Sequence, residues 1–139
     1  MLRRKADRSG AAAVEMAMVA PVILLMAFAV SDYGRIVHAY LVVSNAARCG
    51  ADYAAVHGFT TATRSSWETC IREAVDEELQ NLPGYDVDDS TVEITTSVDA
   101  DDVASTSVSV TYPFRMTITW PGLPSSSMLS HRVEMRRIQ

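Results

Sequence analysis

The segment Ser9-Gly10-Ala11-Ala12-Ala13-Val14-Glu15 opens an apolar run that continues to Val30. From Ala11 to Val30 there are twenty residues, and Glu15 is the only ionisable one among them. Twenty helical residues extend about 30 Å, which is the thickness of the hydrocarbon core of a bilayer. The run therefore predicts a transmembrane helix over residues 11–31.

Residues 1–10 form a basic leader ahead of this run. Its charged residues are Arg3, Arg4, Lys5, Asp7 and Arg8. Because the leader contributes +3 to a total charge of −5, the rest of the chain carries −8. Basic residues that flank a first apolar span stay in the cytoplasm, so we expect residues 32–139 to form a head outside it. The acidic head excludes nucleic acid as a partner, since phosphate binding needs a basic surface.

Glu15 is unusual because it places a carboxylate inside the apolar run. A carboxylate inside a membrane-length helix costs about 2.5–3.5 kcal/mol or more. Such residues are usually functional and paired with another group. We therefore expect Glu15 to have a function that involves a partner.

The leader and the head of the run resemble those of a type IV prepilin: a basic leader that ends in Gly, four small or apolar residues, and a Glu. In that family a membrane-embedded prepilin peptidase cuts after the Gly, which implies a cut between Gly10 and Ala11 here. The resemblance also implies that Glu15 pairs with the freed amine of a neighbouring subunit during assembly. Such a pair is far cheaper to bury in low dielectric than either charge alone.

Further motifs resemble the TadE-like pseudopilins of Tad (tight adherence) pili, most strongly between Ser9 and Val56. The matching segments are Ala13-Val14-Glu15-Met16-Ala17-Met18-Val19-Ala20-Pro21, Asp32-Tyr33-Gly34-Arg35 and Asn45-Ala46-Ala47-Arg48-Cys49-Gly50-Ala51. Tyr112-Pro113-Phe114 and Glu134-Met135-Arg136 are a looser match near the end. Met16 replaces the family's usual aromatic residue, Cys49 replaces a common acidic one, and the tail has Arg137 where Glu is typical.

This resemblance implies a minor pilin or pseudopilin that takes part in the assembly or initiation of a Tad-type adhesion pilus. Its implied partners are the prepilin peptidase, other pilins and pseudopilins, the Tad assembly platform in the inner membrane, and membrane lipid. The protein would first be a single-pass protein of the inner membrane with its head outside, and then part of an extracellular pilus. Bulk Tad subunits are typically much shorter than this chain, which favours a minor role.

Two other interpretations of the N-terminus are open. Ala27-Phe28-Ala29 offers a cleavage pattern for an ordinary secretory signal peptide, although the apolar run is longer than the usual 7–15 residues. The run would otherwise be an uncleaved anchor. In either case the protein would be a membrane-anchored or secreted extracytoplasmic binding module, in which the helix does not take part in assembly.

The helix is predicted to continue past the membrane to about residue 57. Apolar or small residues recur at three- and four-residue steps, which is typical of an amphipathic helix. They are Tyr33, Ile36, Tyr40, Val43, Ala47, Gly50 and Ala54. Because the later members are small, we expect this end to pack closely against the head.

The head is predicted to be α+β, with the long helix packed on a second helix and a small antiparallel sheet. Ser65 and Glu68 fit a capping box that starts the second helix, which runs to about Leu82. Alternating residues predict strands at 92–97 and 107–112, joined by an acidic turn at 99–102. A short strand at 116–120 and a final one at 129–138 would give three or four strands, with Pro113 interrupting the sheet.

Cys49 and Cys70 are the only cysteines. Outside the cytoplasm, a pair on facing helices is a plausible disulfide, and closing its loop would contribute on the order of 3 kcal/mol. Two buried free thiols are the alternative.

No catalytic, cofactor or metal motif is present. The three histidines are scattered, and no H-x-x-x-H, C-x-x-C or G-x-S-x-G motif occurs. The run Asp86-Val87-Asp88-Asp89-Ser90 lacks the glycine and glutamate of a calcium loop, and is typical of a solvated turn. We therefore expect a protein that is not an enzyme and that needs neither a cofactor nor a metal.

Overall fold

The computed structural model describes residues 9–98, 104–118, 122 and 124–137. The basic residues of the leader, the acidic turn at 99–102 and the end of the predicted 116–120 strand lie outside the described residues.

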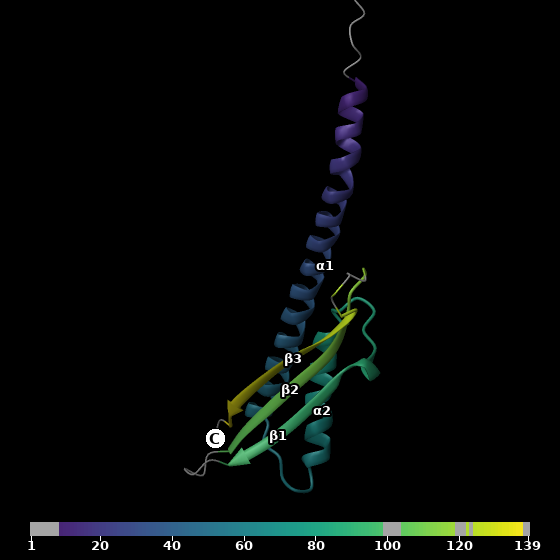
Figure 1. Ribbon diagram of the computed structural model, residues 1–139. Helices are drawn as coiled ribbons and strands as arrows, with labels where there is room; N and C mark the ends of the chain where they lie inside the picture. The colour runs from purple at the N-terminus through teal and green to yellow at the C-terminus, as the bar shows by residue number, and fades with distance from the viewer. Residues whose placement is uncertain (1–8, 99–103, 119–121, 123, 138–139) are drawn as a thin grey trace, which may run out of the picture.

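The longest element is helix α1 (Ser9–Val56), whose 48 residues form one continuous α-helix. The prediction that the apolar helix continues to about residue 57 is confirmed. Neither Pro21 nor Gly34 interrupts it. The N-terminal half of α1 extends away from the other elements, and its C-terminal half packs against them (Figure 1).

Helix α2 (Arg64–Leu79) follows α1 after a short connection. The predicted capping box is wrong, because the N-cap of α2 is Thr63, two residues before the predicted Ser65, and it makes no side-chain cap bond. The Thr63 hydroxyl instead accepts the N–H of Thr60 at 2.9 Å. Glu68 pairs with Arg64 Nε at 2.9 Å rather than reaching back to the backbone. The helix also ends three residues before the predicted Leu82.

The remaining elements form a three-stranded antiparallel sheet in the order β1-β2-β3. The strands are β1 (Thr91–Val98), β2 (Ala104–Arg115) and β3 (Ser126–Arg136). The register pairs Ile94 with Val108, and Val108 with Val133. The predicted hairpin between the first two strands is confirmed, and so is the α+β class.

Two details of the predicted sheet are wrong. Strand β2 runs through Pro113, which pairs with Met128 of β3. Pairing with β1 ends at Thr111, so Pro113 lies where β2 has a single neighbouring strand, and proline is tolerated at such an edge. Residues 116–118 form a bend rather than a strand.

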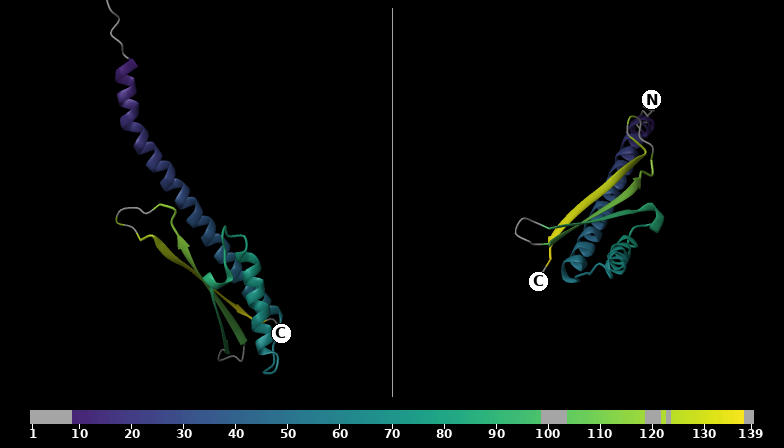
Figure 2. Two further views of the ribbon diagram at one scale, coloured as in Figure 1. Left: turned by 90° about the vertical axis from the view of Figure 1, so that its right-hand side faces the viewer. Right: turned by 90° about the horizontal axis from the view of Figure 1, so that it is seen from below.

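One face of the sheet covers α1 and α2, with β3 over α1 and β1 nearest α2 (Figure 2). The core lies between these layers. Its fully buried larger side chains are Val43, Ile71, Val75, Leu79, Val108 and Val110. Removing each such aliphatic side chain from water contributes about 1.5–3 kcal/mol. Of the predicted α1 stripe, Val43, Ala47 and Ala54 are buried as expected, whereas Tyr33 and Tyr40 are exposed.

The close approach predicted for the small residues occurs at Gly50. A Cβ atom on Gly50 would lie 2.7 Å from Cγ2 of Val75, 3.2 Å from Cγ1 of Val108 and 3.3 Å from Cγ2 of Ile71. Because real Cβ atoms do not approach carbon so closely, α2 and β2 can lie against α1 here only when residue 50 has no side chain.

The connection between α2 and β1 is held in place by Tyr85. Its hydroxyl donates to Asp76 Oδ1 at 2.7 Å and lies 2.9 Å from the Ser90 hydroxyl. Burial, together with the neighbouring Asp76 carboxylate, raises the pKa of Tyr85 to about 12. A short 3₁₀ turn, η1 (Val87–Asp89), completes the connection.

Candidate functional site

The apolar half of α1 is exposed along its whole length. Its large apolar side chains between residues 14 and 30 are 49–75% exposed. They are Val14, Met16, Met18, Val19, Val22, Ile23, Leu24, Leu25, Met26, Phe28 and Val30. A continuous apolar surface of this size is unfavourable in water and marks a contact with lipid or protein. By length and composition, α1 can cross a membrane.

Gly10, Ala11 and Glu15 all lie in the first turns of α1 and are exposed. Ala11 and Glu15 are four residues apart, so they lie on the same side of the helix, one turn from each other. This spacing allows Glu15 to reach an amine at Ala11 of its own helix or of an adjacent one. Cleavage after Gly10 stays a prediction.

The two cysteines are free thiols in this structure. Burial raises the pKa of the Cys49 thiol above its ordinary value. The carboxylate of Glu78, which lies against Cys49, raises this pKa further. Cys70 lies instead against Tyr53. Glu78 and Cys70 are eight residues apart on α2, which is roughly 12 Å along the helix. The two thiols thus have different neighbours in this structure, and the Cys49–Cys70 disulfide stays a prediction.

The structure brings together a group of residues where α1 leaves its apolar segment, and sequence reasoning did not find it. Asp32 is only 6% exposed, although it lies just two residues after Val30, the end of the apolar run. Its two carboxylate oxygens accept the backbone N–H groups of Thr117 and Ile118, each at 3.4 Å. Arg35 Nη1 donates to Asp32 Oδ1 at 3.3 Å and also to the Thr117 hydroxyl.

Arg35 links this group to the sheet. Its guanidinium carbon lies 5.4 Å from the centre of the Phe114 ring, in cation–π geometry. We call Asp32, Arg35, Phe114, Thr117 and Ile118 the exit clasp. The clasp fixes the connection after β2 to the first turns of α1 beyond the apolar run.

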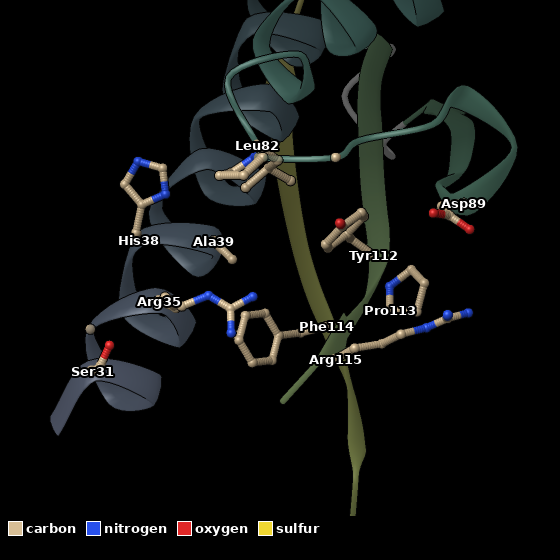
Figure 3. Close-up of a pocket in the computed structure, with 13 residues that line it drawn as sticks. Ser31, Arg35, His38, Ala39, Leu82, Asp89, Tyr112, Pro113, Phe114 and Arg115 are labelled. Carbon is tan, nitrogen blue, oxygen red and sulfur yellow. The ribbon is translucent and has the colours of Figure 1, made fainter. Parts of the chain in front are cut away.

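A cavity of about 440 Å³ lies beside the exit clasp. It is bounded by α1 between Ser31 and Ala39, by the connection after α2, and by the end of β2. Figure 3 shows Arg35 directed from α1 toward Phe114 on β2, with Tyr112 above Phe114 and Arg115 on the β2 side. A space of this size is within the range of ligand sites in proteins, about 300–1,000 Å³.

Within the described ranges, no group of three or more His, Cys, Asp or Glu side chains is placed to hold a metal ion. Asp86 of the acidic run caps η1, where its carboxylate accepts the N–H of Asp88 at 3.3 Å. His57 stacks on Tyr53, and His131 lies 3.3 Å from the Tyr40 hydroxyl. Asp86, His57 and His131 thus contact backbone or tyrosine. Among the described residues, none of the three contacts a second candidate catalytic side chain.

These features define a class: an α+β head carried on one N-terminal helix that can cross a membrane. The model of the family described as TadE-like protein matches residues 10–52 of the chain. The resemblance drawn from the residues of α1 is thereby confirmed for residues 10–52, which lie within that helix. No curated protein and no solved structure matches the chain.

Proposed function

We propose that this chain is a minor pilin or pseudopilin that acts in the assembly or initiation of a Tad-type pilus. A prepilin peptidase cuts it between Gly10 and Ala11. Until assembly, α1 holds it in the cytoplasmic membrane with the head outside. The mature helix then packs against other pilins and pseudopilins at the Tad assembly platform.

One observation carries this proposal: the TadE-like match includes the N-terminal half of α1, which the head of the same chain leaves exposed. The match begins at Gly10, and every large apolar side chain between residues 14 and 30 is exposed. A simple membrane anchor would need this apolar surface but not an acid within it, because a lone carboxylate is unfavourable in lipid. Glu15 therefore supports a helix that meets other helices rather than lipid alone.

The pairing chemistry follows from the low dielectric of the membrane. Cleavage after Gly10 would create an ammonium group at Ala11, and burying that group alone is as unfavourable as burying the carboxylate alone. An incoming subunit that brings its ammonium to Glu15 of its neighbour removes both penalties together. This pairing would set the axial position of one helix against the next.

Glu15→Ala tests the proposal, with Glu77→Ala as a control that removes an exposed acid from α2. We expect both variants to be cleaved, because the cleavage site is unchanged. Incorporation of Glu15→Ala into sheared pili should fall about tenfold or more, since the neighbour's ammonium stays unpaired. The measurement is quantitative mass spectrometry of the membrane and pilus fractions. Equal incorporation of the two variants would contradict the pairing.

A further inference from the structure

The half of α1 that packs on the head also has a side that the described part of the head leaves uncovered. Exposed residues recur along this side at steps of three, four or seven residues, which keeps them on one side of the helix. They are Tyr33, Val37, Leu41, Arg48 and Asp52, and we call them the outer stripe. The buried residues of the same half, such as Ala39 and Val43, lie on the side that faces the core.

Two apolar members of the outer stripe lie too far along α1 for lipid to cover them. Val30 ends the apolar run, and Val37 and Leu41 lie about 10 and 17 Å further along the helix. The headgroup layer adds only roughly 5–7 Å beyond the hydrocarbon core. With α1 across a membrane, these side chains therefore face water, and they are 39% and 56% exposed. A row of exposed apolar side chains that continues the apolar half of α1 points to a protein contact.

Arg48 and Asp52 continue the outer stripe beyond its apolar members. They are exposed, opposite in charge and one helical turn apart. Among the described residues, neither forms an ion pair, and they do not pair with each other. A basic residue that precedes an acidic one by four positions is the less favourable order for a pair within a helix. The two charges are therefore available to a partner that presents an acid opposite Arg48 and a base opposite Asp52.

A second copy of this chain presents this arrangement. Two copies with α1 in one membrane are parallel and at the same height, so a two-fold axis along the membrane normal can bring their outer stripes face to face. The axis places Arg48 of each copy close to Asp52 of the other, which gives two ion pairs. It also brings Tyr33, Val37 and Leu41 of the two copies together. An unrelated apolar helix would cover the apolar members but would not match the charges.

The outer stripe is small for an interface between freely diffusing proteins. From Tyr33 to Asp52 it is about 28 Å long and one helix wide. Stable interfaces of soluble proteins bury about 800 Å² on each partner, which is more than such a stripe offers. A membrane offsets this difference, because it fixes the orientation of both copies and raises their effective concentration.

We infer that two copies of this chain pair in the membrane through their outer stripes, with their α1 helices parallel. Packed helices commonly cross at about 20°. Helices that touch at Leu41 with this angle are roughly 13 Å further apart at Glu15, which lies 26 residues earlier. The pair therefore leaves Glu15 accessible to another subunit. The inference rests on the proposed function only for the placement of α1 in the membrane.

The test reverses charges in the full, uncleaved chain, so that it does not depend on processing or on Glu15. Arg48→Glu and Asp52→Arg should each weaken pairing about tenfold, because two like-charged contacts replace two ion pairs. When the two variants are mixed, they should form heterodimers as readily as the unaltered chain forms dimers, since every contact again joins opposite charges. Native mass spectrometry from mild-detergent micelles, at several protein-to-detergent ratios, counts monomers, homodimers and heterodimers.

Leu41→Gln and His38→Gln test the apolar part of the outer stripe as a matched pair. Both residues are exposed on α1 and lie three positions apart, but His38 is not in the outer stripe and lines the cavity instead. Leu41→Gln should weaken pairing several-fold, because an amide replaces an apolar contact. His38→Gln should pair as the unaltered chain does.

Three results would overturn the inference. The first is a monomeric unaltered chain at every ratio, and the second is a mixture of Arg48→Glu and Asp52→Arg with no more heterodimer than either variant has homodimer. The third is equal pairing by Leu41→Gln and His38→Gln. A mature chain that begins at Met1 would contradict the proposed function and leave this inference standing, since the helix would still cross the membrane.

Discussion

Asp32 shows what a single residue does at the boundary between helix and head. It lies two residues after the apolar run, at a position where a charged residue is ordinarily solvated, yet it is buried. Its partners Thr117 and Ile118 are 85 and 86 residues away in the sequence. Local patterns carry no information about contacts at that separation. Sequence analysis could therefore identify the Asp32–Arg35 motif by its family resemblance, but not its role.

Asp32→Ala should lower the free energy of unfolding of the head by about 1–3 kcal/mol, because it leaves two backbone N–H groups and Arg35 without their acceptor. Urea unfolding of the full chain in detergent micelles measures this change. Amide hydrogen exchange at Thr117 and Ile118 should accelerate in parallel. Glu77→Ala, which removes an exposed acid from α2, is the control. Equal effects of the two substitutions would show that the clasp contributes nothing.

Among the elements, α1 does two different things along its length. Its first half exposes apolar side chains, and α2 and the sheet pack against its second half. The contrast is clear at its two interior glycines. Around Gly34 nothing lies within 4 Å of an added Cβ, whereas around Gly50 three side chains lie within 3.3 Å.

The same substitution at these glycines should therefore have opposite effects. Gly34→Ala should raise the free energy of unfolding by up to about 1 kcal/mol, because alanine favours helix and nothing obstructs it. Gly50→Ala should lower it by about 1–2 kcal/mol, because the overpacking of Val75 outweighs the gain in helix propensity. Thermal unfolding followed by circular dichroism measures both. Stabilisation by Gly50→Ala would contradict the close packing of α1 and α2.

The elements could be predicted from the sequence where hydrophobic periodicity is strong. That was so for α1, for the existence of α2, and for the β1–β2 hairpin. Prediction failed where a side chain had a competing use or a proline had a special position. The N-cap of α2 is Thr63 rather than Ser65, and the Thr63 hydroxyl bonds the loop. Pro113 is accommodated because the pairing of β2 with β1 stops at Thr111. The cavity depends on three segments distant in sequence, so no single stretch could indicate it.

At the scale of the whole molecule, charge and polarity are divided along the long axis. In the described part of the chain, the first half of α1 is apolar and the acidic head lies at the other end (Figure 1). In the sequence, a leader with a charge of +3 precedes the apolar half, which is the order that the proposed membrane topology requires. The outer stripe begins at the boundary between the apolar and the acidic parts.

The measurement that most directly tests the proposed function is the intact mass of the mature protein, purified from cells that contain its prepilin peptidase. We predict a chain that begins at Ala11, and that Gly10→Ala leaves uncleaved. A mature chain that begins at Met1 or at Val30 would contradict the proposal, since the helix would then be an uncleaved anchor or the remnant of a secretory signal.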